Sequence, residues 1–137
     1  SVDGETVGEI GRGALVLLGV EVGDTDAHAK LMAQKIANLR VFTDENDKMN
    51  LSVRDVQGEM LVVSQFTLYA STKKGNRPSY IRSAPEPISR PMYEKFLKHL
   101  SATLGKEVAH GELGADMKVS LVNDGPVTSC IDSKNRE

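Results

Sequence analysis

Cysteine and tryptophan are almost absent from this sequence, which contains one Cys, at position 130, and no Trp. A single cysteine cannot form an intramolecular disulfide, and it cannot supply the several thiolates of a Cys-based structural zinc site. Because Cys130 lies within a short apolar segment, we expect it to be a small core residue. The three histidines, His28, His99 and His110, follow no metal-ligand spacing, so the sequence predicts no metal site and no cofactor.

The sequence also lacks an excess of charge of one sign and a long hydrophobic run. Lys and Arg together number 17 and Asp and Glu 19, for a formal net charge of -2. This balance excludes a protein that binds nucleic acid by bulk positive charge alone. The longest apolar run, from Ala14 to Val20, contains Gly19 and is far too short to cross a bilayer, and no signal-peptide pattern opens the chain. We therefore expect a cytoplasmic protein without a membrane partner.

The composition that is present is typical of a folded domain. Of the 137 residues, 39% are hydrophobic and 26% charged, with no repeat, low-complexity tract or linker, so we expect one domain over residues 1–137 with a polar tail at 132–137. Asp3-Gly4 is a strong two-residue hairpin signal, yet only two residues precede it. The sequence thus suggests a first strand lying before Ser1; the alternative is a frayed terminus.

Hydrophobic periodicity predicts about six strands and two helices. Ala14–Val20 is expected to be a buried central strand, and a second buried strand is expected from Glu59 through Tyr69. Helical spacing predicts one helix from the cap cluster at 24–26 to about Asn38, and another between the prolines at 85–91 and Gly105. This order favours an α+β architecture with mixed or antiparallel sheets. Extended segments or strands are also expected at 5–10, 40–43, 117–121 and 127–131.

Two short polar motifs and a basic segment are candidate functional features. Ser64–Leu68 follows a hydrophobic strand, where backbone N–H groups and hydroxyls can converge on a ligand; outward-facing strand residues are the alternative interpretation. Asn123–Thr128 contains a turn signal followed by Pro126, which would remove a donor at a strand entry. Between Met60 and Pro85 there is no Asp or Glu but four cations, which suits either an anionic ligand or a solvated loop.

The two motifs together resemble the paired signature of the D-aminoacyl-tRNA deacylases. Supporting segments follow in the same order along nearly the whole chain, at 11–19, 48–51, 76–79 and 114–117. The resemblance implies hydrolysis of the ester that joins a D-amino acid, or glycine, to the 3′-terminal adenosine of tRNA. It further implies a barrel-like core and a homodimer whose site lies at the subunit interface.

The resemblance also assigns roles to residues. Gly125 and Pro126 match a cis dipeptide that enters the partner subunit's pocket and excludes L-amino acids, because a rigid element can reject one enantiomer sterically. The family's first strand carries a Gln-Arg-Val segment that would precede Ser1. The residues that match the pocket-lining catalytic motif are Ser64, Gln65, Phe66 and Thr67.

Four further residues are substrate-binding candidates by the same resemblance. Asn123 belongs to the Gly-Pro motif, and Met117 and Leu113 match positions near the pocket wall. The family usually has Phe where Leu113 stands. Arg77, in the basic segment, is a candidate for contacting the RNA end.

Two mechanisms and two rival functions remain open from the sequence. Backbone N–H groups around Phe66 and Thr67 could form an oxyanion site, with attack assisted by the substrate's own 2′-hydroxyl. Alternatively, Thr67 is a covalent nucleophile, although no base is adjacent in sequence. The rival functions are a non-catalytic nucleic-acid-binding relative and a general esterase for free D-amino esters.

Overall fold

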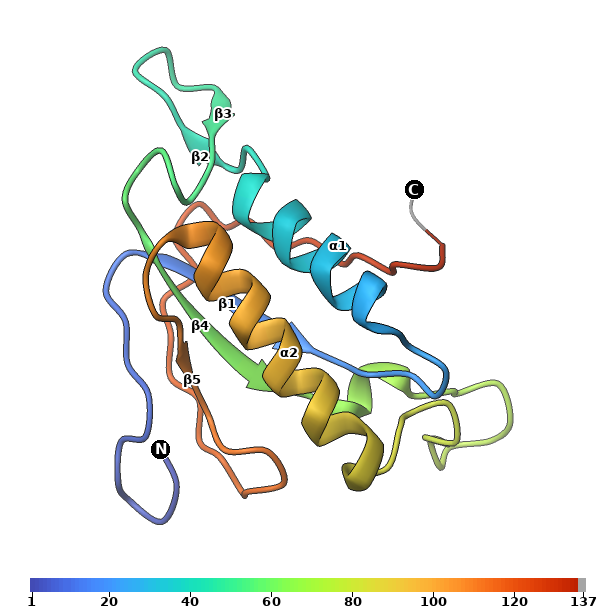
Figure 1. Ribbon diagram of the computed structural model, residues 1–137. Coiled ribbons are helices and arrows are strands. Elements are labelled where there is room, and N and C mark those ends of the chain that lie inside the picture. Colours follow the sequence, from blue (N-terminus) through green and yellow to red (C-terminus); the bar gives the residue numbers. More distant parts are fainter. Residues whose placement is uncertain (136–137) are drawn as a thin grey trace.

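Two helices pack on one face of a three-stranded sheet in the computed structural model, which describes residues 1–135 (Figure 1). The sheet has the order β1-β4-β5, and both pairings are parallel. Parallel neighbours need a crossover connection, and each helix lies in one of the two crossovers. A small antiparallel pair, β2 with β3, follows the first helix. The bounds are β1 Gly13–Leu18, α1 Asp26–Asn38, β2 Phe42–Thr43, β3 Met49–Leu51, β4 Glu59–Ser64, α2 Glu86–Leu104 and β5 Ala109–His110.

The expected α+β class with two helices is confirmed, with two corrections to the sheet. The main sheet is parallel rather than mixed or antiparallel, and the first apolar run, expected to be central, forms an edge strand because β4, not β1, has a neighbour on both sides. The pairing of strands depends on how the crossover helices pack their apolar faces on the sheet. The local hydrophobic pattern of a strand does not encode which neighbours it will have. Closure into a barrel remains a prediction.

Local sequence signals account for both helix boundaries. Thr25 caps α1: its Oγ1 accepts a hydrogen bond from the His28 N–H, and the His28 ring accepts one from the Thr25 N–H. The end of α2 is set by Gly105, whose φ of 75° is left-handed and whose N–H donates to Ser101 O at 2.9 Å. Pro91 lies inside α2 rather than in its first turn, since the helix already begins at Glu86.

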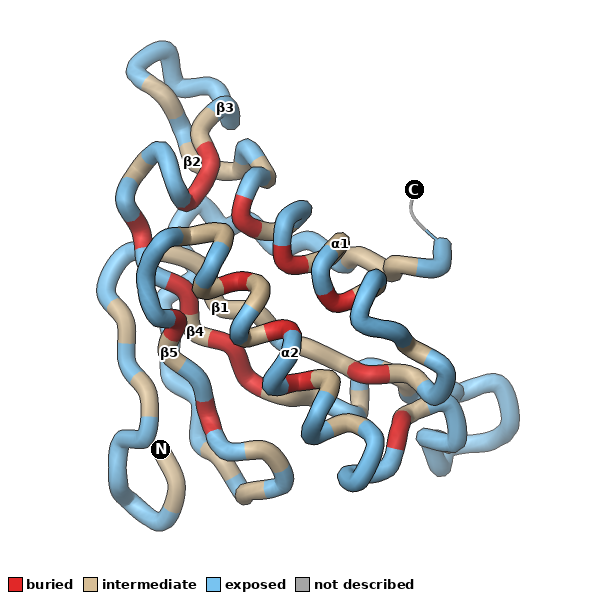
Figure 2. Tube along the Cα trace, viewed as in Figure 1, coloured by how far each residue is buried: buried red, intermediate tan, exposed pale blue. Residues whose placement is uncertain are grey.

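The core lies between the helices and the sheet, where Figure 2 shows the buried residues gathered. Ala33 and Ala37 are fully buried on α1, and these small side chains let α2 approach closely with Phe96 and Leu100. The Tyr93 hydroxyl donates to a β4 carbonyl, Val62 O, at 3.1 Å. No helix within residues 1–135 is both long and apolar enough to cross a membrane.

The N-terminal residues contact the chain after β5, but both segments form fewer strands than expected. Asp3 and Gly4 both have positive φ, at 49° and 83°, and close the predicted two-residue turn between Val2 and Glu5. Val2 also pairs with Met117. Neither residues 5–10 nor the segments 117–121 and 127–131 form a strand.

The segment after β5 is the largest departure from the expected fold. It runs back along the sheet on the side away from α2 (Figure 1), and residues 118–130 are all exposed. Cys130 is therefore exposed and not the predicted core residue. An extended segment needs a hydrogen-bonded neighbour to become a strand, and beyond Lys118 the residues 1–135 offer this segment none.

Candidate active site

The motif 64–68 lies where β4 ends, not within a longer strand as the sequence predicted. The last sheet hydrogen bond runs from Gln65 N to Leu18 O at 2.7 Å, and a 3-10 turn, η1 (Phe66–Tyr69), begins directly after it. Leu68 N donates to Gln65 O and Ala70 N to Thr67 O, each at 3.2 Å. The turn therefore stands at the carboxyl ends of β1 and β4, the edge at which parallel sheets bind ligands.

Two backbone donors of this turn are free. The first N–H groups of a 3-10 turn have no acceptor within the turn, which leaves those of Phe66 and Thr67. No acceptor among residues 1–135 takes a hydrogen bond from either of them. A pair of fixed, adjacent donors can stabilise an oxygen that gains negative charge.

The side chains of the motif supply contacts but no base. Gln65 Nε2 donates to Thr67 Oγ1, and within residues 1–135 Thr67 has no hydrogen bond to a His, Lys or carboxylate. Phe66 is 59% exposed, with its ring 5.3 Å from that of Tyr80 in an edge-to-face arrangement. The site is thus open to solvent on the side of Phe66.

Tyr69 fixes the far end of the turn, a role that the sequence analysis missed. A Cβ placed on Gly19 would lie 2.9 Å from Tyr69 Cε2, so glycine is what lets this ring pack against the end of β1. Burial, and then the nearby Asp24 and Glu21 carboxylates, raise the pKa of Tyr69 to about 12, so its hydroxyl stays neutral. Gly19, which interrupts an otherwise apolar run, was the feature of the sequence that could have indicated this close packing.

Met117 and Leu113 lie near this edge of the sheet. Gly111 N donates to Val62 O at 3.0 Å, which places the chain after β5 beside the last residues of β4. Met117 Sδ packs so closely on Gly111 that a Cβ there would lie 2.5 Å from it. Leu113 packs against the core cluster. Their predicted contact with the substrate remains a prediction.

The Asn123–Thr128 motif lies apart from the turn at 66–69, and its hydrogen bonds within residues 1–135 are to its own residues. Asn123 Nδ2 donates to Thr128 Oγ1 at 3.0 Å, and Val127 N donates to Asn123 Oδ1 at 3.3 Å. Gly125 has a φ of 131°, which favours glycine. No hydrogen bond or ion pair in the described part of the chain joins this motif to Ser64–Thr67.

The prediction of a cis bond between Gly125 and Pro126 is wrong for this structure, because residues 1–135 contain no cis peptide bond. Trans is the lower-energy isomer of an X–Pro bond unless tertiary contacts select cis. This exposed segment packs against nothing that would select it.

An aromatic contact joins the basic loop at 71–79 to the site. A bridge between Ser71 and Ser79 closes the loop, and Tyr80, just after it, packs on Phe66. Arg77 is exposed, and no carboxylate within residues 1–135 pairs with it. The described residues also contain no group of three or more His, Cys, Asp or Glu placed to hold a metal ion.

Comparison with known proteins decides the family. The profile of the family described as D-Tyr-tRNA(Tyr) deacylase matches residues 1–132. The chain belongs to this family. It is 56% identical over all of its 137 residues to a D-aminoacyl-tRNA deacylase of Bacteroides fragilis (strain YCH46), covering 91% of that relative. It is 58% identical over 134 residues to a D-aminoacyl-tRNA deacylase of Dechloromonas aromatica (strain RCB), covering 98% of this chain and 89% of that relative.

Two solved structures resemble the fold of this deacylase-family chain. One is titled c-Myc DNA Unwinding Element Binding Protein. It is 43% identical with a TM-score of 0.85, and the match covers 93% of this chain and 86% of that chain. The other, titled as a probable eukaryotic D-amino acid tRNA deacylase, has a TM-score of 0.62 and 16% identity over 82% of this chain and 70% of its own. The second likeness concerns the fold alone.

Proposed function

We propose that this chain hydrolyses the ester between a D-amino acid, or glycine, and the 3′-terminal adenosine of tRNA in the cytoplasm. The observation that carries the proposal is the pair of free N–H groups at Phe66 and Thr67, at the end of β4, in a chain with close relatives named D-aminoacyl-tRNA deacylases. In this proposal Arg77 and its basic loop hold the RNA end, a role supported by the contact that joins Tyr80, just after that loop, to Phe66.

In this proposal the turn stabilises the transition state and the substrate supplies the proton chemistry. The ester carbonyl oxygen accepts hydrogen bonds from the N–H groups of Phe66 and Thr67 as water attacks the carbonyl carbon. The C–O bond to the ribose 3′ oxygen then breaks, and that oxygen takes a proton. The vicinal 2′-hydroxyl is the donor closest to it, and the 2′ oxygen takes in turn the proton that the attacking water loses. Thr67 has no base partner among residues 1–135 to make it a nucleophile.

The assay that tests the function is single-turnover deacylation of D-Tyr-tRNA and L-Tyr-tRNA by saturating protein. We expect the D-ester to be cleaved at least about a hundredfold faster, which corresponds to a difference of ~2.7 kcal/mol in the barrier. Equal rates for both esters, or cleavage of free D-tyrosine ester as fast as of D-Tyr-tRNA, would favour a general esterase.

We also propose that the protein is a homodimer with a shared site. Four exposed apolar residues of the segment after β5 support this: Val119, Leu121, Val122 and Val127, with Leu17 on the sheet face away from the helices. A second copy would cover these side chains and give the unpaired segment its strand partner, which would allow a barrel-like closure. In the dimer, Gly125-Pro126 of one subunit would lie near Ser64–Thr67 of the other. Because the bond is trans here, we attribute the selection of D-amino acids to the position of that segment and not to a cis bond.

The dimer is tested by sedimentation at micromolar concentration. We expect a dimer that is lost when Val122, which is 91% exposed, is changed to Asp, because a buried unpaired charge is costly. Val22→Asp, at an exposed residue before α1, is the control that should remain dimeric. An active monomer would exclude a shared site.

The second candidate function is nucleic-acid binding without hydrolysis. It is favoured by the likeness to the structure titled c-Myc DNA Unwinding Element Binding Protein. Binding of uncharged tRNA together with unchanged D-Tyr-tRNA in the same assay would support it.

A further inference from the structure

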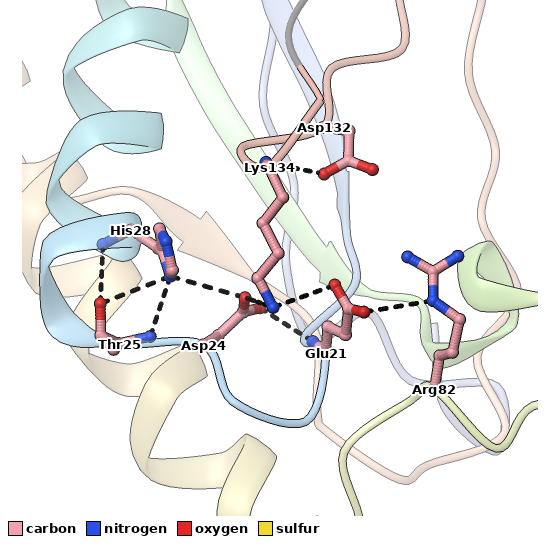
Figure 3. Close-up of polar contacts among 7 residues, drawn as sticks. All are labelled: Glu21, Asp24, Thr25, His28, Arg82, Asp132 and Lys134. Atoms are coloured by element: carbon pink, nitrogen blue, oxygen red, sulfur yellow. Dashed lines mark hydrogen bonds and ion pairs between the residues drawn. The ribbon is translucent and has the colours of Figure 1, made fainter.

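Arg82 is held from two sides beside the proposed site, and Figure 3 shows its contact with Glu21 on one of them. Its Nε donates to Glu21 Oε1 at 3.1 Å, and its guanidinium carbon lies 5.3 Å from the centroid of the Tyr69 ring. An arginine can bond a carboxylate and stack on an aromatic face at the same time, because its guanidinium is planar. Arg82 thus joins the loop after β1 to the last residue of the turn at 66–69.

Tyr69 connects this arrangement to the two free N–H groups. Its ring packs against Gly19 as well as Arg82, and its backbone ends the turn that begins at Phe66. A shift of this ring would move the turn, and the N–H groups of Phe66 and Thr67 move with it. Small displacements of such groups cost large factors in rate.

A second cation keeps Glu21 in place. Oε2 of Glu21 and Oδ1 of Asp24 are buried and have no hydrogen-bond partner within the described residues. Lys134 Nζ lies 3.2 Å from the first oxygen and 3.5 Å from the second. Glu21 N also donates to Asp24 Oδ2 at 2.8 Å. Lys134 is thus a cation that both buried oxygens share, so this residue near the C-terminus stabilises the loop that orients Arg82.

The charge states of the cluster suit a fixed arrangement. The hydrogen bond from Arg82, and then the ion pair with Lys134, hold the pKa of Glu21 below its usual range, and the same contacts raise the pKa values of Arg82 and Lys134. Glu21 and both cations are therefore charged at neutral pH.

We propose that Arg82 is a positioning residue, which Glu21 and Lys134 hold against Tyr69 so that the turn at 66–69 keeps its two N–H groups aimed at the substrate. The inference rests on the proposed deacylase function and deepens it. It distinguishes Arg82 from Arg77: the first is engaged within the protein, while the second has no carboxylate partner in the described part of the chain.

The test compares Arg82→Met, Glu21→Gln and Lys134→Met in the full chain. We expect kcat for D-Tyr-tRNA to fall about tenfold or more in Arg82→Met and in the same direction in the other two, with KM changed less than about threefold. Arg82→Lys keeps the charge but loses the planar stack, so its kcat should lie between those of wild type and Arg82→Met. Arg90→Met is the matched control, because Arg90 pairs with Glu86 on the exposed surface of α2.

Glu21→Gln separates positioning from direct RNA contact. If Arg82 acted by binding RNA, loss of its carboxylate partner would leave kcat unchanged and lower KM, because the cation would be freed. That outcome would overturn the proposal.

A readout independent of activity is amide hydrogen exchange at Leu68 and Ala70, whose N–H groups close the turn. We expect exchange at both to be at least about tenfold faster in Arg82→Met than in wild type and unchanged in Arg90→Met. Unchanged exchange in Arg82→Met overturns the positioning role even if the wild-type protein is active. If the wild-type protein cleaves no ester but exchange is still faster in Arg82→Met, the deacylase function is rejected and the positioning of the turn is retained.

Discussion

A D-Tyr-tRNA that ends in 2′-deoxyadenosine is expected to be deacylated at least about a hundredfold more slowly than one that ends in adenosine. The protein offers donors but no base: the N–H groups of Phe66 and Thr67 are free, and Thr67 Oγ1 is bonded only to Gln65 Nε2 among the described residues. The proton for the leaving 3′ oxygen would then come from the neighbouring 2′-hydroxyl. Positioned general acid or base groups contribute roughly a hundred- to ten-thousandfold, so their removal should have an effect of that size.

The measurement is single-turnover deacylation of the two esters at saturating protein, each divided by its rate without protein. This division matters because the 2′-hydroxyl also affects spontaneous hydrolysis. Equal enhancement of both esters would contradict the substrate-assisted mechanism.

Thr67→Ala serves as the companion experiment on the other mechanism. If Thr67 only accepts a hydrogen bond from Gln65, its loss should lower the rate about two- to tenfold, since one such bond is worth ~0.5–1.5 kcal/mol. A loss above about a thousandfold with unchanged folding and binding is ~4 kcal/mol and would identify Thr67 as the nucleophile.

Gly13→Ala is expected to destabilise the protein by about 3 kcal/mol or more. Gly13 begins β1 opposite Glu59 on β4, and a Cβ there would lie 1.7 Å from the Glu59 carbonyl oxygen. The backbone of residue 13 fixes the position of the Cβ, and the oxygen belongs to the backbone of Glu59, so no side-chain rotation relieves the clash. The two strands would have to separate where the central strand begins.

Gly11→Ala is the control for this substitution, because a Cβ on Gly11 meets nothing within 4 Å. We expect it to leave stability unchanged or to raise it by ~0.4–1 kcal/mol through the lower entropy of the unfolded chain. Urea unfolding of both variants, followed by circular dichroism, makes the comparison. Equal midpoints would show that β1 is not fixed to β4 at this point.

Much of the local structure could be predicted because it depends on neighbouring residues. Thr25 and Gly105 set helix boundaries through hydrogen bonds and a φ value that their own positions determine. Asp3-Gly4 forms the turn that its residue types favour. The motif Ser64–Leu68 was recognisable as a motif because its residue types, and not their contacts, carry the family resemblance.

The parts that could not be predicted depend on residues far apart in the chain. The sequence indicated where β1 and β4 begin, but only the packed crossovers decided that they are parallel and that β1 is an edge strand. The end of β4 at Ser64 and the turn after it depend on the bond from Gln65 N to Leu18 O. The expected strand at 127–131 fails because extended backbone needs a partner.

By itself the sequence determined the α+β class, both helices and the residues of the candidate site. Only the tertiary structure decided which of these residues meet: it placed Ser64–Thr67 at the edge of the sheet and left the motif that contains Pro126 apart, with a trans bond. It also brought Arg82 to Tyr69, residues with no shared pattern. The physical reason is that hydrogen-bonded caps and turns are short-range, whereas sheet pairing, proline isomer and charge clusters are fixed by contacts between distant segments.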